Sequence, residues 1–311
     1  MGKPPFSSPK PERRVQKMRP KSKMNRWIQF QYASLVVPGM LVFTLGLILP
    51  MALGIGYSFT SWNGMTVEKP FVGLDNYAQM MRDSYAGAAW WFTIRFTIWN
   101  TVIQNVAAIL LAVALDSGIK GQKFFRTVFF IPCLISAVVV GFVWLKMYGN
   151  ILPAVMDGLG LNINAMLFGS ERTVLSGMII ANNWQWVGYW MLIYLAALQS
   201  IPTDLYEAAR VDGANGLQQF RGITLPMLAP AMTICIVGIT TGSLKVYDLL
   251  VSSTGGGPGR ASTSIIYYIY NTAIGGRQYG YGSALSISLI LALLLVAVLQ
   301  VVILKKREVQ M

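Results

Sequence analysis

The sequence predicts an all-α membrane protein with six transmembrane helices, on the evidence of its composition, its apolar runs and the distribution of its charges. Of the 311 residues, 54% are hydrophobic and only 12% are charged, which is about half the charged fraction of a soluble domain. The mean hydropathy is +0.52. So much apolar side chain cannot be enclosed in a water-soluble core of this size, and lipid is the solvent expected for most of the chain.

Six apolar runs of about 20 residues or more are each long enough to cross a bilayer. They cover residues 32–59, 96–115, 124–148, 173–198, 229–251 and 284–304. The first run follows a basic lead too long for a cleavable signal peptide, so we expect an uncleaved span. The predicted organisation is a basic tail over 1–30, a six-helix transmembrane domain over 31–304 with a polar loop at 200–228, and a short tail over 305–311.

The basic residues, which give the chain a net charge of +13, fall mainly on one side of these spans. Nine of them precede the first run, where only Glu12 opposes them, and alternate loops divide the basic residues seventeen to seven. The positive-inside bias then places both termini in the cytoplasm. Because the excess charge orients the protein, nucleic-acid binding is an unnecessary hypothesis.

The residue types that are missing exclude several kinds of chemistry. The sequence contains no histidine, so a Ser-His-Asp triad, a His-ligated zinc and a His-ligated haem are excluded. Cys133 and Cys235 lie in apolar runs and are expected to be buried thiols. The glycine-rich stretch 255–262 lacks the Gly-Lys-Ser/Thr ending of a phosphate loop. We therefore expect no enzyme activity and no cofactor in this chain.

The polar segment 200–226 is too hydrophilic for the bilayer and lies on the cytoplasmic side by the parity of the spans. Pro202 near its start, with Asp204 and Glu207 in the opening turns, favours a helix. That helix should end near Gly213 and be followed by a second short helix over 217–223. The segment is therefore predicted to form a helix-turn-helix elbow.

This elbow carries a resemblance to a known family. Glu207-Ala208-Ala209, three residues, Gly213, nine residues, Ile223, one residue and Leu225-Pro226 match the EAA loop of permease subunits of ATP-binding-cassette importers. The stretches FVGLDNY, KGQKFFRTVFFIP, LQSIPTDLYEAARVDGA and TGGGP resemble the carbohydrate-uptake branch, the maltose and glycerol-phosphate permease type. The resemblance runs from about residue 35 to the C-terminus and implies the fold of a type I importer permease.

The resemblance also implies a role for the elbow and a set of partners. The elbow would be the coupling helix, seated in a cleft of a separate ATPase subunit that binds ATP and Mg. The docking residues carried over are Glu207, Ala208, Ala209, Asp212 and Gly213. The implied partners are a second homologous permease, two ATP-binding subunits and an extracytoplasmic sugar-binding protein, in a bacterial inner membrane. The alternative is that Glu207 only caps its own helix.

A polar and aromatic stripe in the fourth span is the candidate solute site. Asn182, Trp186 and Tyr189 recur at helical spacing, with Gln185 alongside. Amides suit the hydroxyls of a sugar and aromatic faces suit its C–H groups, and polar groups at this depth usually face a pathway. The resemblance places a second stripe in the fifth span, at Gly242, Ser243, Val246 and Tyr247. The alternative is that Asn182 and Trp186 only pack helix against helix.

Two charged residues in the fifth span leave the substrate class open. Lys245 and Asp248 are three residues apart and are expected to pair along the helix. A lysine that faces the pathway would instead favour an anionic substrate, such as a uronate or a sugar phosphate. The main alternative function is an ion-driven secondary transporter, for which Asp248 is the only candidate buried carboxylate in the spans.

Overall fold

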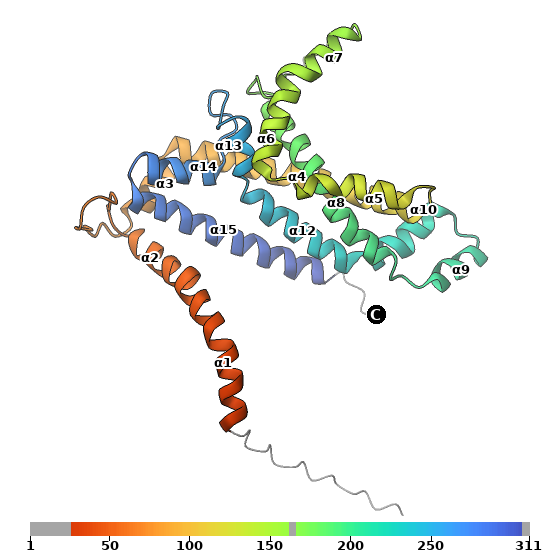
Figure 1. Ribbon diagram of the computed structural model, residues 1–311, viewed down its shortest axis with the longest axis horizontal. Coiled ribbons are helices and arrows are strands. Elements are labelled where there is room, and N and C mark those ends of the chain that lie inside the picture. The colour runs from red at the N-terminus through yellow and green to blue at the C-terminus, as the bar shows by residue number, and fades with distance from the viewer. Residues whose placement is uncertain (1–25, 162–165, 307–311) are drawn as a thin grey trace, which may run out of the picture. The chain divides into compact units, whose positions relative to one another are not determined.

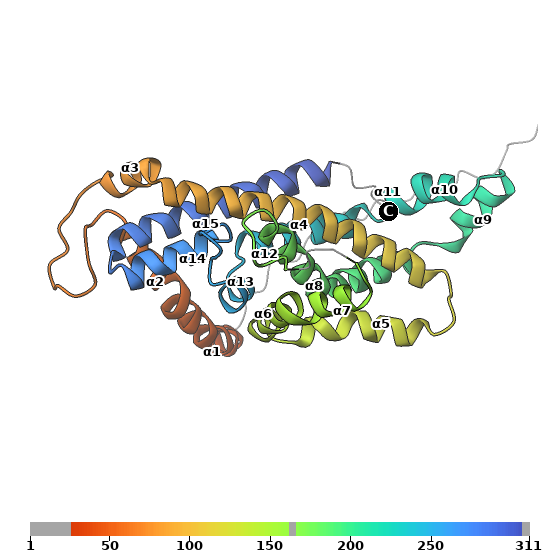
Figure 2. The ribbon, with the colours of Figure 1, turned by 90° about the horizontal axis from the view of Figure 1, so that it is seen from above.

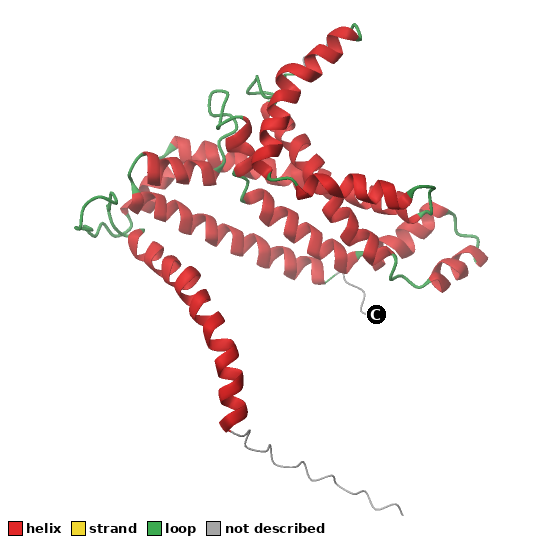
Figure 3. Cartoon of the chain, viewed as in Figure 1, coloured by secondary structure: helices red, strands yellow, loops and turns green. Residues whose placement is uncertain are grey.

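The computed structural model describes residues 26–161 and 166–306, with side chains from residue 31 onward (Figure 1). Most of the predicted N-terminal tail and the end of the C-terminal tail lie outside these residues. Regular structure in the described ranges is entirely helical (Figure 3), apart from one isolated antiparallel bridge between Thr60 and Phe71. The chain divides into two compact units, residues 1–53 and 54–311.

The N-terminal unit is dominated by α1 (Arg26–Phe43), which continues through a π-helical turn (Thr44–Ile48) into α2 (Leu49–Tyr57). This apolar helical stretch, Gln31–Tyr57, is 27 residues long. Its large apolar side chains are exposed within the chain, as Leu35 at 78% illustrates. A helix with apolar side chains on all of its faces is typical of a membrane span.

The second unit is a bundle of helices (Figure 2). Its helices are α3 (Asp75–Arg82), α4 (Ser84–Asp116), α5 (Gln122–Phe130), α6 (Ala137–Lys146), α7 (Leu152–Gly158), α8 (Val174–Leu198), α9 (Thr203–Val211), α10 (Gly216–Gln219), α11 (Leu225–Met227), α12 (Ala229–Leu244), α13 (Asp248–Ser253), α14 (Ile265–Tyr270) and α15 (Tyr279–Lys305). Helix α4 packs along α8 and α12, and α12 also packs on α15.

Four helices in the described residues are long and apolar enough to cross a membrane, or five if α12 and the segment before it, bent by 68°, form one span. Helix α8 is not among them, although its bounds match the predicted fourth span. Polar residues such as Asn182, Asn183 and Gln185 lower its hydropathy, and the bundle buries much of its surface. Neighbouring helices cover part of this helix, so a weaker apolar signal is sufficient.

Two predicted spans are not continuous helices. The run 124–148 breaks after α5 into a 3-10 turn at Ile131–Leu134, and α6 begins at Ala137. Pro132 lies in this break, where its missing N–H costs no helical hydrogen bond. The run 229–251 breaks between Leu244 and Asp248. The prediction of one unbroken helix was wrong at both places.

The close approach of α5 to α8 depends on a glycine. A β-carbon placed on Gly188 would lie 1.9 Å from the carbonyl oxygen of Phe129. Only glycine allows the backbones of α5 and α8 to come so close. Small residues commonly have this role between membrane helices. Below this contact, Met191, Tyr194 and Leu195 of α8 join the buried cluster that packs α8 against α4 and α12.

The predicted elbow is confirmed as a helix, a turn and a second helix. Helix α9 ends at Val211, and Gly213 follows with φ of +78°, a left-handed conformation that glycine adopts without strain. Asn215 and Gln218 then form a capping box at the start of α10. A contact of 3.0 Å between the hydroxyl groups of Tyr206 and Thr224 ties the two arms together.

Candidate solute cavity and docking elbow

A cavity of about 270 Å³ lies between α8 and α12. It is lined by Asn182, Trp186, Trp190, Gly238, Ile239, Gly242 and Ser243. Four of these, Asn182, Trp186, Gly242 and Ser243, belong to the two stripes that the sequence predicts. The structure thus brings the two stripes to one cavity, and whether they bind substrate stays a prediction.

The other three lining residues extend the same helix faces by about one turn. Trp190 follows Trp186 by four residues, and Gly238 precedes Gly242 by four. A β-carbon on Gly238 would lie 2.4 Å from the ring of Trp190, so the indole rests directly on the glycine. Extending each stripe by one helical repeat would have found these positions.

A buried asparagine on α4 holds the cavity wall. The side-chain nitrogen of Asn100 donates to the hydroxyl oxygen of Ser243 at 2.8 Å and to the Gln104 carbonyl at 3.1 Å. The Asn100 side-chain oxygen accepts from Asn183 of α8 at 2.9 Å. Asn100 is 1% exposed. It therefore joins α4, α8 and α12 with both of its amide hydrogens in use.

This arrangement fixes what Ser243 can offer to a ligand. The Ser243 oxygen accepts from Asn100, and its own hydrogen has no hydrogen-bond acceptor among the described residues. A hydroxyl in this state has one donor left. Because Ser243 lines the cavity, that donor is available to an oxygen atom of a solute.

Two predicted residues of α8 lie away from the cavity. Gln185 is 1% exposed, and its amide nitrogen donates to the carbonyl oxygen of Ile135, at the break between α5 and α6, at 2.9 Å. Its contact thus satisfies a backbone carbonyl that the helix break leaves free. Tyr189 is 40% exposed, with its ring against Trp186 and Trp190 at centroid distances of 6.2 and 4.9 Å. It stands beside the cavity-lining tryptophans and does not line the cavity.

The helix break after α12 changes the setting of the remaining predicted residues. Val246 is buried in the apolar cluster beneath α13, and the ring of Tyr247 packs near those of Tyr267 and Tyr270. Lys245 and Asp248 flank the break, and no ion pair joins them in the described part of the chain. The expected pairing along one helix is wrong, because the two residues no longer share a helix.

The predicted docking residues gather on the outside of the elbow. Glu207, Ala208, Asp212 and Gly213 are exposed, and Ala209 is half-buried. Val211, between them, is 88% exposed. The elbow thus presents small residues, one exposed apolar side chain and two carboxylates to the solvent, and whether a partner docks there stays a prediction.

Comparison with known proteins decides the family. The sequence profile of "Binding-protein-dependent transport system inner membrane component" matches residues 104–308. The chain belongs to this family. The predicted resemblance is thereby confirmed, and nothing supports the alternative of an ion-driven transporter.

Members of this inner-membrane-component family align along nearly the whole chain. The "Probable starch degradation products transport system permease protein AmyD" of Thermoanaerobacterium thermosulfurigenes is 34% identical, over 90% of this chain and 96% of its own. The "Multiple sugar-binding transport system permease protein MsmF" of Streptococcus mutans is 36% identical, over 84% of this chain and 90% of its own.

Solved structures confirm the predicted type I permease fold. A chain from a "bacterial ABC transporter involved in the import of the acidic polysaccharide alginate" aligns with a TM-score of 0.78 and 22% identity, over 90% of this chain and 98% of that one. At this identity, the likeness concerns the fold.

Proposed function

We propose that this protein is a membrane permease subunit of an ATP-driven, binding-protein-dependent importer of a sugar or oligosaccharide. One observation carries the proposal: the elbow is the direct connection between α8 and α12, the two helices that line the cavity. A displacement of the elbow by a partner would reach both walls of the cavity through continuous backbone. A partner that binds the elbow more tightly in one conformation can thus shift the cavity toward that conformation.

The docking step needs a contact that is both close and specific. Ala208, Ala209 and Gly213 let a partner backbone approach, and Val211 offers apolar surface to bury. Glu207 and Asp212 supply charges that orient the partner. We infer that the partner is an ATP-binding subunit, because the glycine-rich loop of this chain lacks the lysine that a phosphate loop requires.

The composition of the whole complex belongs to the same proposal. A single elbow per chain suggests a second homologous permease and two ATP-binding subunits, with an extracytoplasmic binding protein that delivers the solute. A solved complex of an alginate transporter with a periplasmic protein, similar in fold to this chain, supports the last partner. The proposed orientation in a bacterial inner membrane has both termini in the cytoplasm, as the basic loops favour.

The chemistry of the cavity favours a saccharide. Two indole rings provide apolar faces, while Asn182 and the free donor of Ser243 provide hydrogen bonds. Sugar rings have this combination of C–H faces and hydroxyl groups. The names of the bacterial relatives, for starch degradation products and for multiple sugars, support the same class.

Reconstitution tests this function. The chain would be co-expressed with its permease and ATPase partners, placed in proteoliposomes and supplied with the binding protein and a panel of labelled oligosaccharides. Accumulation should require ATP on the elbow side and binding protein on the other. Saturable uptake by the purified chain alone, driven by an ion gradient, would overturn the proposal.

A further inference from the structure

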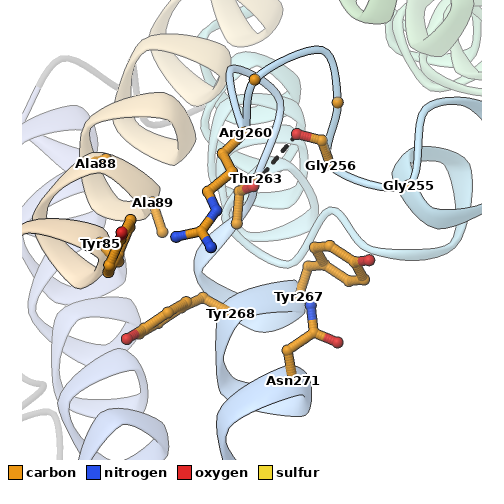
Figure 4. Close-up of a pocket in the computed structure, with 12 residues that line it drawn as sticks. Tyr85, Ala88, Ala89, Gly255, Gly256, Arg260, Thr263, Tyr267, Tyr268 and Asn271 are labelled. Carbon is orange, nitrogen blue, oxygen red and sulfur yellow. Dashed lines mark hydrogen bonds between the residues drawn. The ribbon is translucent and has the colours of Figure 1, made fainter. Parts of the chain in front are cut away.

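A second and larger cavity lies in the part of the chain that the proposed topology places outside. Its volume is about 450 Å³ (Figure 4). It is formed by the start of α4, the glycine-rich loop after α13 and one face of α14. The lining residues that matter here are Tyr85, Arg260, Thr263, Tyr267, Tyr268 and Asn271. This cavity shares no lining residue with the one between α8 and α12.

The glycine-rich loop directs an arginine into this cavity. Arg260 has φ of +71°, a left-handed conformation that is unusual for a residue with a side chain. Its guanidinium carbon lies 4.0 Å from the ring centre of Tyr85, and Figure 4 shows the group reaching from the loop toward α4. The contact with Tyr85 orients the exposed guanidinium toward α4.

The charge of Arg260 is not neutralised within the described residues. No carboxylate there lies within 4.0 Å of its nitrogens, and none of its N–H groups has a hydrogen-bond acceptor. Glu171 packs against the neighbouring Gly259, where a β-carbon would lie 2.0 Å from a carboxylate oxygen, and still forms no ion pair with Arg260. Arg260 is exposed, so water satisfies these donors until a ligand displaces it, and a guanidinium in this state is suited to an anionic ligand.

The acid that caps the start of α4 is already engaged. Asp83 accepts hydrogen bonds from the hydroxyl groups of Tyr268 and Tyr281, and from the N–H groups of Tyr85 and Ala86. Burial raises the pKa of Asp83, but these four donors outweigh it and hold the pKa below its ordinary value. Its negative charge is thus spread over neighbouring donors, and Arg260 remains available.

The other lining residues of this cavity favour an anionic ligand that contains a sugar ring. Tyr267 and Tyr268 provide aromatic surface, while Asn271 and Thr263 provide polar groups for hydroxyls. Ligand cavities typically measure about 300–1,000 Å³, so this volume suits a whole sugar unit. An acidic side chain of a docked protein would fill only part of it.

We propose that this outer cavity binds the acidic unit of an anionic saccharide, with Arg260 paired to its carboxylate or phosphate group. The inference rests on the proposed sugar import and narrows its substrate class. Lys245, which is exposed at the end of α12 and has no ion-pair partner among the described residues, adds a second positive charge but does not line the inner cavity. The outer cavity would select the solute by charge before it reaches α8 and α12.

The test uses the full chain in lipid nanodiscs and four probes: glucuronate, glucose 6-phosphate, glucose and acetate. Affinities would be measured by titration, and contact with the sugar ring by saturation-transfer NMR. We expect glucuronate or glucose 6-phosphate to bind about tenfold or more tightly than glucose, and acetate to bind weakly, because a charge-assisted pair adds to the ring contacts. Equal affinity for the charged and neutral sugars would overturn the proposal.

Variants separate this site from general electrostatic attraction. Arg260→Gln should remove the preference for the charged sugar, and Arg260→Lys should keep part of it. Arg277→Gln is the matched control, because Arg277 also has positive φ, at 53°, and does not line the cavity. Asn271→Ala, which removes an uncharged lining residue, should weaken all sugars alike. Equal losses from Arg260→Gln and Arg277→Gln would contradict the assignment.

Two further measurements separate a saccharide site from a contact with the binding protein. If Arg260→Gln weakens only the docking of the binding protein, and no saccharide binds the wild-type chain, Arg260 is a protein contact and the proposal is wrong. ATP-driven uptake by the whole complex tests the proposed function separately. If the complex takes up a neutral sugar and Arg260→Gln leaves this uptake unchanged, the proposed importer function stands and the proposed outer site is wrong.

Discussion

The amide of Asn100 donates a 2.8 Å hydrogen bond to the hydroxyl of Ser243 and so connects α4 to the wall of the cavity between α8 and α12. The two residues are 143 positions apart in the sequence. The contact turns the Ser243 hydroxyl into a donor for the cavity, because its oxygen is already engaged by Asn100. Asn100 thus acts on a ligand through Ser243 and is a positioning residue.

We therefore expect both Asn100→Ala and Ser243→Ala to raise the KM of sugar uptake, with the larger effect from Asn100→Ala, which also removes the contacts with Gln104 and Asn183. One neutral hydrogen bond is worth roughly 1 kcal/mol, or about fivefold. The double variant should be little worse than Asn100→Ala alone, because that change already removes the oriented donor of Ser243. Transport kinetics in proteoliposomes would check this, with protein level as the control. Fully additive losses would show that the two residues act independently.

Alanine substitution of Trp186 and of Tyr189 should reduce sugar uptake to different extents, although the sequence places both residues on one stripe. Trp186 lines the cavity, whereas Tyr189 is 40% exposed beside it. Trp186→Ala should weaken uptake several-fold, since an aromatic contact is worth on the order of 1 kcal/mol. Tyr189→Ala should have a smaller effect, through the support that it gives to Trp186 and Trp190. Equal losses, with normal protein levels, would place Tyr189 in direct contact with the solute.

Helical periodicity predicted the face of α8 and the elbow, but it could not predict how α8 is rotated in the bundle. Gln185 lies one position from Trp186, and the structure points it at the carbonyl of Ile135, which is free because α5 ends nearby. The break at Pro132 had a local signal, whereas the break at residues 245–247 contains neither Gly nor Pro. Non-local packing also placed Asn100, which no local pattern connects to Ser243.

Gly188→Ala adds only one methyl group, but it should lower the stability of the protein clearly. The new β-carbon would lie 1.9 Å from the carbonyl oxygen of Phe129, so α5 and α8 must separate. Overpacking of this kind typically costs about 1–3 kcal/mol. Gly87→Ala is the matched control, because Gly87 is also helical and nothing lies within 4 Å of an added β-carbon. Thermal unfolding in detergent should show a lower midpoint for Gly188→Ala alone.

Asp83→Asn should lower thermal stability in a pH-dependent way. The pKa of Asp83 is held below its ordinary value of 3.8 by four donors, after burial has raised it. A depressed pKa contributes stability above about pH 3.8 and loses it as the pH falls through the folded-state value. The difference in melting temperature between wild type and variant should therefore be largest near neutral pH and shrink below pH 4. If the difference in melting temperature is the same at all pH values, the destabilisation comes from lost hydrogen bonds and not from the charge of Asp83.

Glu207→Lys and Gly213→Pro should abolish transport and leave membrane insertion intact. The first reverses a charge on the exposed face of the elbow, and the second cannot adopt the φ of +78° at Gly213, because proline is fixed near −65°. Neither residue contacts the bundle core, so protein level should be normal. Glu68→Lys, a reversal of another exposed acid, is the control. Co-purification of the ATPase with each variant decides the cause: retained ATPase with lost transport would place the defect in the coupling motion, and normal transport would refute the docking role.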